Sequence, residues 1–148
     1  TNKDIDNALN DPDNNLNKLE GQTSAELIDK LQPDKAILDC PSTNTAAYAK
    51  YIKSLITKKD TEIIAEHKAD VNYPVVSAAS IIAKVLRDKE IDKLKKKYNV
   101  DFGSGYPADE RTRNFLKENY NKYPFFRTTW STYKKVVEDR KQSSLGDF

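Results

Sequence analysis

The chain has 148 residues, 32% of them charged and 37% hydrophobic, with a net charge of +2. No apolar run approaches the roughly 20 residues of a membrane span, and no charged-then-apolar targeting pattern opens the chain, so a membrane protein is excluded and a cytoplasmic location is expected. A single cysteine, Cys40, excludes an internal disulfide and fits a reducing compartment.

The charge is distributed unevenly along the chain. Residues 1–30 hold seven acids and three bases, a net −4, so residues 31–148 carry +6. Much of the excess lies between Lys84 and Lys97. Such a segment can neutralise the phosphates of a nucleic acid or form a solvated helix face. The chain has no methionine and begins with Thr1, from which we expect a fragment or a processed product.

The first half of the chain predicts an α/β arrangement. Residues 1–15, rich in Asp and Asn, are expected to form a loop or a poorly ordered lead-in. Apolar spacing then predicts a helix, a strand, a helix and a strand over residues 15–31, 35–38, 46–56 and 61–65. Asp39 lies at the carboxyl end of the first strand. The strand, helix, strand order predicts a parallel pair with a helical crossover.

The second half predicts mainly helices. From Val75 onward the apolar spacing is helical, and Gly103-Ser104-Gly105 interrupts it. Two further helices, over residues 111–121 and 133–141, are expected to form a small C-terminal lobe. Phe125 and Trp130 are its predicted core.

Two aspartates are candidate catalytic residues. Asp39 and Asp70 each follow a predicted strand of one sheet, so their carboxylates are expected at the same edge, where ligands bind in open α/β sheets. Phosphodiester hydrolysis needs an activated nucleophile and cancellation of charge, which two divalent metal ions held by hard oxygen ligands can provide. Spacing alone does not distinguish this role from that of an ordinary cap at the end of a strand.

Four other residues are candidates for contact with nucleic acid. Tyr106 follows a Gly-Ser-Gly turn, where an aromatic ring can stack on a sugar or base or can simply anchor the turn. Lys68 and Lys84 can bind backbone phosphates or be surface lysines. Ser77 can hydrogen-bond phosphate, although close helix packing is the favoured interpretation.

Four segments together resemble the ribonuclease HII family, the type 2 ribonucleases H of archaea and eukaryotes. They are Asp39-Cys40-Pro41, the run from Glu66 to Asp88, Phe102-Gly103-Ser104-Gly105-Tyr106-Pro107 and Arg127-Thr128-Thr129-Trp130. The resemblance implies an α/β ribonuclease H-like fold with a helical C-terminal lobe. It also implies that Asp39 and Asp70 are the third and fourth acidic ligands of a site for Mg²⁺ or Mn²⁺. It further implies that Tyr106 packs against the nucleotide at the RNA-to-DNA junction.

One motif of that family is missing from the chain. The family's Asp-Glu-x-Gly-Arg-Gly segment does not occur, and the only Asp-Glu pair, Asp109-Glu110, has no glycines after it. We therefore expect the first strands and half of the metal site to be absent and the chain to be inactive alone. The expected organisation is a partial catalytic domain over residues 1–100, a substrate loop and helical lobe over 101–141, and a tail over 142–148.

The tail has the spacing Gln-x-x-Leu-x-x-Phe, formed by Gln142, Leu145 and Phe148. It resembles the box by which replication and repair enzymes dock on the sliding clamp PCNA, without the usual second aromatic residue.

The resemblance as a whole implies an archaeal-type monomer that cleaves RNA in RNA–DNA hybrids and single ribonucleotides in duplex DNA by two-metal-ion hydrolysis. The alternative is a non-catalytic module that binds nucleic acid or the clamp, which the missing Asp-Glu favours for this chain taken alone.

Overall fold

The computed structural model describes residues 2–145, with side chains described as far as Gln142. The chain divides into two compact units. One unit comprises residues 11–84, and the other combines residues 1–10 with residues 85–148. Within residues 2–145, no helix is both long and apolar enough to cross a bilayer.

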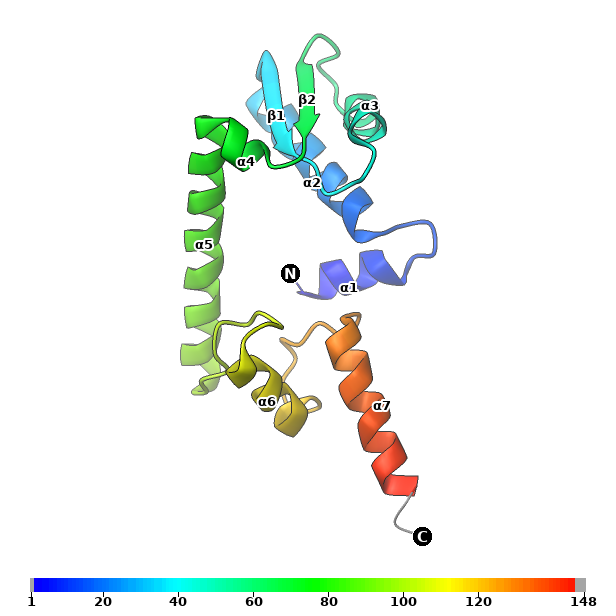
Figure 1. The fold of residues 1–148 in the computed structure, drawn as a ribbon, viewed down its shortest axis with the longest axis vertical. Coiled ribbons are helices and arrows are strands. Elements are labelled where there is room, and N and C mark those ends of the chain that lie inside the picture. The colour runs from blue at the N-terminus through cyan, green and yellow to red at the C-terminus, as the bar shows by residue number, and fades with distance from the viewer. Residues whose placement is uncertain (1, 146–148) are drawn as a thin grey trace. The chain divides into compact units, whose positions relative to one another are not determined.

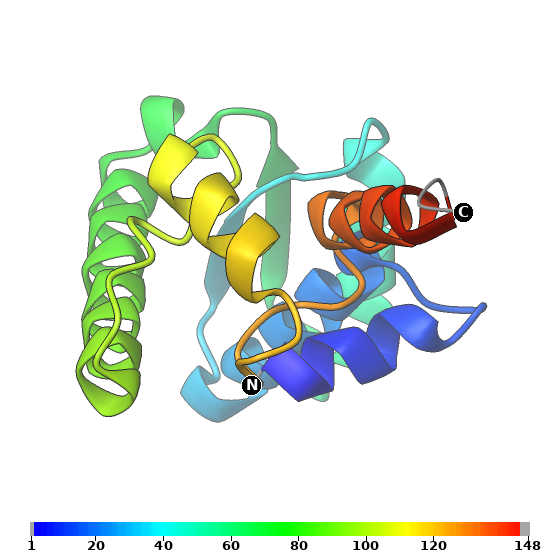
Figure 2. The same ribbon diagram turned by 90° about the horizontal axis from the view of Figure 1, so that it is seen from below.

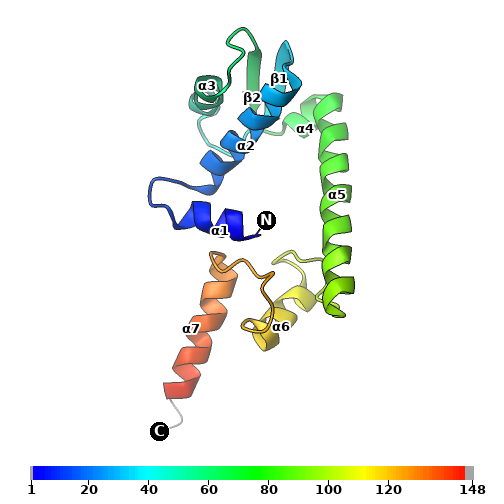
Figure 3. The same ribbon diagram turned by 180° about the vertical axis from the view of Figure 1, so that it is seen from behind.

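The unit of residues 11–84 contains a small parallel sheet. Strands β1 (Lys35–Asp39) and β2 (Glu62–Glu66) pair in parallel and are joined through helix α3 (Thr45–Leu55). Helix α2 (Leu16–Leu31) precedes them, and both helices lie alongside the strands (Figures 1 and 3). The predicted parallel pair with a helical crossover is therefore confirmed.

Local signals in the sequence fix the helix ends of this unit. The Asn15 side chain accepts a hydrogen bond from the Lys18 N–H at 2.9 Å, and the Asn44 side chain accepts one from the Ala47 N–H at 2.9 Å. Each bond satisfies a backbone donor that the first turn of a helix leaves unpaired. Helix α2 ends at Gln32, whose backbone is left-handed, directly before Pro33.

The core of this unit lies between the two helices and the sheet. Ile52 of α3 and Ile56, the residue that follows α3, are almost completely buried, and they belong to one cluster with Ala25 and Ile28 of α2. Thr61 is also fully buried, and its hydroxyl donates to the Pro33 carbonyl at 2.8 Å. This packing holds the two strands side by side, and so sets where their carboxyl ends lie.

Helix α5 runs without interruption from Pro74 to Tyr98 and has no buried residue. It follows the four-residue helix α4 (Ala69–Asn72). Large apolar side chains in its first half are mostly exposed, with Val75, Ile82 and Leu86 at 66%, 61% and 57%. An apolar stripe along a helix usually packs against the core of the protein. The predicted helical spacing is correct, but this stripe does not face the described core.

The other unit is built around aromatic side chains. Helices α6 (Glu110–Asn119) and α7 (Ser131–Leu145) belong to it. The ring centroid of Phe125 lies 4.9 Å from that of Phe102 and 5.1 Å from that of Tyr98, so Phe125 belongs to this aromatic cluster, although it is half-buried. Trp130 is only half-buried, and the guanidinium carbon of Arg127 lies 5.0 Å from its ring centroid.

Helix α1 (Asn2–Asn10) replaces the loop expected at the start of the chain, so that expectation is wrong. Figure 2 shows α1 beside the segment that leads into α7. The carboxylate of Asp6 accepts hydrogen bonds from the backbone N–H and hydroxyl of both Thr128 and Thr129, at 2.5–3.3 Å. Burial by itself raises the pKa of Asp6, but these bonds lower it overall. Long-range contacts therefore hold a segment whose composition predicts a loop.

Candidate active site and nucleotide-contact loop

The carboxyl ends of the two strands carry acidic side chains. Asp39 is the last residue of β1 and is paired in register with Glu66, the last residue of β2. Because the strands are parallel, both residues lie at the same edge of the sheet. The Cys40 N–H donates to the Glu66 carbonyl at 2.9 Å, so the pairing continues past the end of β1.

A tight turn after β2 brings Asp70 to this edge. Lys68 has a left-handed backbone, with φ 58° and ψ 36°, and the chain then enters α4 at the fully buried Ala69. The Ala69 N–H donates to Oδ1 of Asp39 at 3.2 Å. Nδ1 of His67 lies 3.2 Å from the Cys40 carbonyl, which ties the turn to the end of β1. The structure thus brings the backbone of the residue before Asp70 to the Asp39 carboxylate.

Two further carboxylates near this edge were missed by sequence reasoning. Glu66 accepts a hydrogen bond from the Tyr73 hydroxyl at 2.8 Å, and this bond raises the pKa of Tyr73. Loss of solvation raises the pKa of Glu20 in α2, and the negative charge of Asp39 raises it further. Glu66 could have been found from its place at a strand end, whereas helical spacing gives no reason to associate Glu20 with Asp39.

The donor set at this edge suits a hard divalent cation in kind but not in number. Carboxylate oxygens are the ligands that Mg²⁺ and Mn²⁺ prefer. Within residues 2–145, however, no group of three or more His, Cys, Asp or Glu side chains is close enough to hold a metal ion. A complete metal site is therefore not formed by the described residues.

The predicted phosphate-binding residues lie along the same unit. Lys68 is exposed in the turn before α4, and Lys84 is exposed on α5. Ser77 lies in the first turn of α5 and is half-buried, and its N–H donates to the Tyr73 carbonyl at 3.0 Å. Their exposure permits contact with a ligand but does not distinguish phosphate binding from a surface or packing role.

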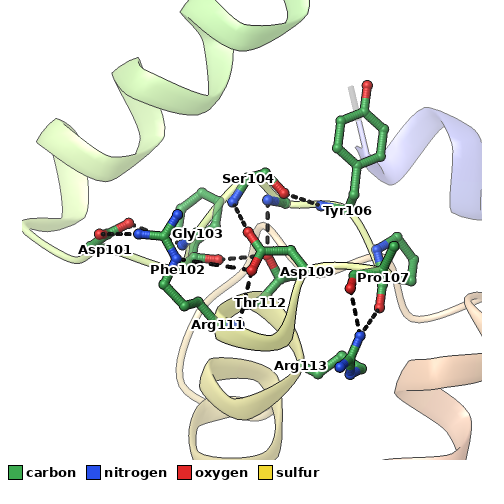
Figure 4. A network of polar contacts seen from close by, with 12 residues as sticks. Asp101, Phe102, Gly103, Ser104, Tyr106, Pro107, Asp109, Arg111, Thr112 and Arg113 are labelled. Atoms are coloured by element: carbon green, nitrogen blue, oxygen red, sulfur yellow. Dashed lines mark hydrogen bonds and ion pairs between the residues drawn. The ribbon is translucent and has the colours of Figure 1, made fainter.

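Tyr106 belongs to the other unit, in a loop with two left-handed glycines. Gly103 and Gly105 have φ of +74° and +75°, a backbone conformation that favours glycine. At Gly103 an added Cβ would lie 2.6 Å from Oδ2 of Asp109, so the position has no room for a side chain. Tyr106 is 48% exposed, and Figure 4 shows its ring pointing away from the polar contacts beneath it.

Asp109 organises this loop from the start of α6. Its carboxylate accepts from the Ser104 N–H at 2.7 Å and from the Arg111 N–H at 2.9 Å (Figure 4). The backbone hydrogen bond from Ser104 is the largest of several effects that lower the pKa of Asp109 to about 2. One carboxylate therefore both caps α6 and fixes the backbone two residues before Tyr106.

Thr112 and Arg113 of α6 hold the two sides of the loop. The Thr112 hydroxyl accepts from the Gly105 N–H at 3.0 Å and donates to the Phe102 carbonyl at 2.8 Å. The Arg113 guanidinium donates to the carbonyls of Pro107 and Ala108 at 2.9 and 2.7 Å. The loop is therefore fixed on both sides of Tyr106.

The predicted clamp-binding residues lie at the end of the described chain. Gln142 is exposed on α7, which continues to Leu145, beyond the helix end expected at residue 141. Phe148 lies outside the described residues.

The sheet edge that bears Asp39 and the glycine loop that bears Tyr106 belong to segments by which the sequence resembles the ribonuclease HII family. The model of the family Ribonuclease HII matches residues 3–133, so the chain belongs to the ribonuclease HII family of hydrolases. The resemblance seen in the sequence is thereby confirmed.

Curated relatives and solved structures agree with this assignment. Ribonuclease HII of Pyrococcus furiosus is 46% identical over 132 residues, covering 85% of this chain and 58% of that protein. Ribonuclease HII of Methanosarcina barkeri is 41% identical over 130 residues, covering 80% of this chain and 58% of that protein. The chain thus spans about three fifths of the length of these relatives.

Two solved structures have the same fold. Ribonuclease H2 of Pyrococcus horikoshii matches with a TM-score of 0.80 and 41% identity, over 95% of this chain and 67% of that one. A ribonuclease HII from Archaeoglobus fulgidus, solved in complex with PCNA, matches with a TM-score of 0.80 and 36% identity, over 92% of this chain and 65% of that one. The expected α/β ribonuclease H-like fold with a helical C-terminal lobe is confirmed.

Proposed function

We propose that this chain supplies two catalytic carboxylates and the nucleotide-contact loop of a ribonuclease HII. The reaction is endonucleolytic hydrolysis of the RNA strand of RNA–DNA hybrids and of single ribonucleotides embedded in duplex DNA. The observation that carries the proposal is the hydrogen bond from the Ala69 N–H to Asp39, which links the end of β1 to the residue before Asp70. Membership of the ribonuclease HII family supports the reaction class.

In this proposal Asp39 and Asp70 are two of the ligands of divalent metal ions, Mg²⁺ or Mn²⁺. When bound, such ions neutralise charge on the phosphodiester and activate a water molecule. The remaining ligands are expected from the part of the relatives that this chain does not match, since no group of three or more His, Cys, Asp or Glu side chains among the described residues is close enough to hold a metal ion. The Ala69 N–H orients one oxygen of Asp39, which reduces the reorganisation needed when a cation binds.

The other predicted residues act on the substrate. Tyr106 is half exposed on a fixed loop, a suitable place for a ring that packs on the nucleotide at an RNA-to-DNA junction. Lys68 and Lys84 contact backbone phosphates, and Ser77 donates its hydroxyl to a phosphate oxygen. The exposure of both lysines permits such contact. The expectations of a monomer and of a cytoplasmic location stay predictions.

We further propose that Gln142, Leu145 and Phe148 dock on a sliding clamp. The similarity to a ribonuclease HII solved in complex with PCNA supports this partner. A short segment with the spacing Gln-x-x-Leu-x-x-Phe buries little apolar surface, so we expect micromolar affinity, on the order of −8 kcal/mol. Calorimetry with PCNA of Archaeoglobus fulgidus should detect binding that is lost when residues 142–148 are deleted. Unchanged affinity after the deletion would contradict this assignment.

A second candidate function is a binding module without catalysis. The observation that favours it is the lack of a third metal donor at the strand edge among residues 2–145. Such a module would use the Tyr106 loop and the exposed lysines to hold a hybrid while another protein cleaved it.

A chimera separates the two functions. Residues 3–133 of this chain would replace the matching part of Pyrococcus furiosus ribonuclease HII, and the 148-residue chain alone would serve as the comparison. We expect the chimera to cleave duplex DNA carrying one ribonucleotide in Mg²⁺ or Mn²⁺, and the isolated chain to bind that duplex without cleaving it. A folded chimera that binds without cleaving would favour the binding module. Robust cleavage by the isolated chain would contradict the two-ligand assignment.

A further inference from the structure

Arg87, in helix α5, makes two different contacts with the loop that carries Tyr106 and a third with its neighbour Asp88. Its guanidinium carbon lies 3.7 Å from the centre of the Tyr106 ring. Its Nη1 donates to the Ser104 carbonyl at 2.7 Å and also contacts the Asp88 carboxylate at 3.0 Å. All these residues belong to the same compact unit. The side chain thus binds both the backbone of the loop and its exposed aromatic ring.

Gly105 makes the approach of Arg87 possible. A Cβ atom at this position would lie 3.1 Å from Nη2 of Arg87 and 3.0 Å from Cδ1 of Ile91. The loop backbone therefore passes directly against α5, where a larger residue would crowd the guanidinium. Because Gly105 precedes Tyr106, the same close approach that admits Arg87 also brings the tyrosine ring over it.

The guanidinium determines which face of the ring a ligand can reach. A planar cation stacked on one face of an aromatic ring is attracted by the ring quadrupole and restricts its rotation. The face of Tyr106 turned toward Arg87 is occupied, so a base or sugar must stack on the opposite face. Arg87 is half-buried while Tyr106 is 48% exposed, as expected for a support beneath a contact residue.

We propose that Arg87 is a positioning residue that fixes Tyr106 for discrimination between a ribonucleotide and a deoxyribonucleotide. It acts through the orientation of the tyrosine ring and not through direct contact with the nucleic acid. The inference rests on the proposed function, because it requires that Tyr106 contacts the nucleotide.

The contact itself can be tested without substrate. Hydrogen exchange of the Gly105 and Tyr106 amides, followed by NMR on the full chain, should become roughly three- to tenfold faster in Arg87→Gln, since a stacked and hydrogen-bonded guanidinium is lost. Lys89→Gln removes the same charge from an exposed position of α5 and should leave these rates unchanged. Unchanged exchange in Arg87→Gln would overturn the proposal. Should Arg87→Gln melt at a much lower temperature, Arg87→Lys keeps the charge without the planar stack and takes its place.

A double-mutant cycle tests the role in recognition. Fluorescence anisotropy gives the preference of the chain for duplex DNA with one ribonucleotide over the all-DNA duplex. Arg87→Gln should reduce this preference roughly three- to tenfold, and should have no further effect in a Tyr106→Ala background, because both changes remove the same interaction. An equal loss of affinity for both duplexes that persists in the Tyr106→Ala background would indicate a direct phosphate contact and overturn the proposal.

The two measurements also separate this inference from the proposed function. A wild-type chain that binds both duplexes equally would overturn the role of Tyr106 in recognition, and the role of Arg87 with it. Faster amide exchange in Arg87→Gln would then show that the positioning contact exists and that the proposed contact of Tyr106 with nucleotide was the step that failed.

Discussion

The strand-end carboxylates and the Tyr106 loop are held in place in contrasting ways. At the strand ends, Asp39 accepts a hydrogen bond from the Ala69 N–H, and the site lacks a third metal donor among residues 2–145. The loop, by comparison, is fixed by Asp109 and Thr112 on one side and by Arg87 on the other. The difference indicates that the loop proposed to contact nucleotide is fixed within this chain, whereas the carboxylates proposed as metal ligands need further ligands to become a complete site.

The largest expected effect concerns the carboxylates. In the chimera with Pyrococcus furiosus ribonuclease HII, Asp39→Asn or Asp70→Asn should lower turnover by more than ~100-fold, which is the upper range for loss of an outer-shell partner of a metal ligand. Affinity for the hybrid should change little, because other residues bind the nucleic acid. Single-turnover cleavage and anisotropy measure the two quantities. Asp60→Asn, at an exposed turn, is the control and should leave turnover unchanged. Near-normal turnover of Asp39→Asn or Asp70→Asn would refute the assignment.

A smaller effect is expected from the loop glycines, and it appears in stability. Gly103→Ala should destabilise the chain by about 1–3 kcal/mol, because a left-handed backbone is strained for alanine and its Cβ would meet the Asp109 carboxylate. Gly105→Ala has the same backbone cost, but its Cβ would meet the ends of two flexible side chains. Urea unfolding of both variants should therefore show the greater loss for Gly103→Ala. Equal stability of Gly103→Ala and the wild type would mean that the loop is not fixed as described.

The smallest effect is a dependence of loop order on pH. The pKa of Asp109 is lowered from 3.8 to about 2, so its carboxylate stabilises the folded loop above pH 3.8, and this contribution is lost as the pH falls through about 2. Hydrogen-exchange protection of the Ser104 amide should persist at pH 5 and decline between pH 4 and 2. Asp109→Asn, which can still cap α6, should abolish that pH dependence. An identical acid response in the variant would assign the effect to other groups, such as Asp101.

Much of the fold around the strand edge followed from local sequence signals. Asn15, Asn44 and Pro33 mark helix ends because caps and prolines act through the nearest backbone groups. Asp39 was placed correctly because a buried apolar run predicts a strand, and its last residue must lie at the sheet edge. The positions of helices α2, α3 and α6 were predicted to within one or two residues for the same reason.

The sequence failed where a segment is stabilised by residues far along the chain. Helix α1 is held by Asp6 against Thr128 and Thr129, more than 120 positions away, and composition alone predicted a loop. The apolar stripe of α5 has the spacing of a core-facing helix, yet its side chains are mostly exposed. Periodicity identifies a helix but does not supply the partner that would cover it.

The sequence by itself determined the family, the parallel strand pair and the two candidate aspartates, because these depend on local patterning and on matched motifs. Only the tertiary structure decided how the parts of each site meet. The left-handed turn at Lys68 directs the Ala69 N–H to Asp39, and the close approach of Gly105 to α5 places Arg87 under Tyr106. Both contacts join residues that are separated along the chain, so backbone geometry and packing, which no local pattern encodes, were required to reveal them.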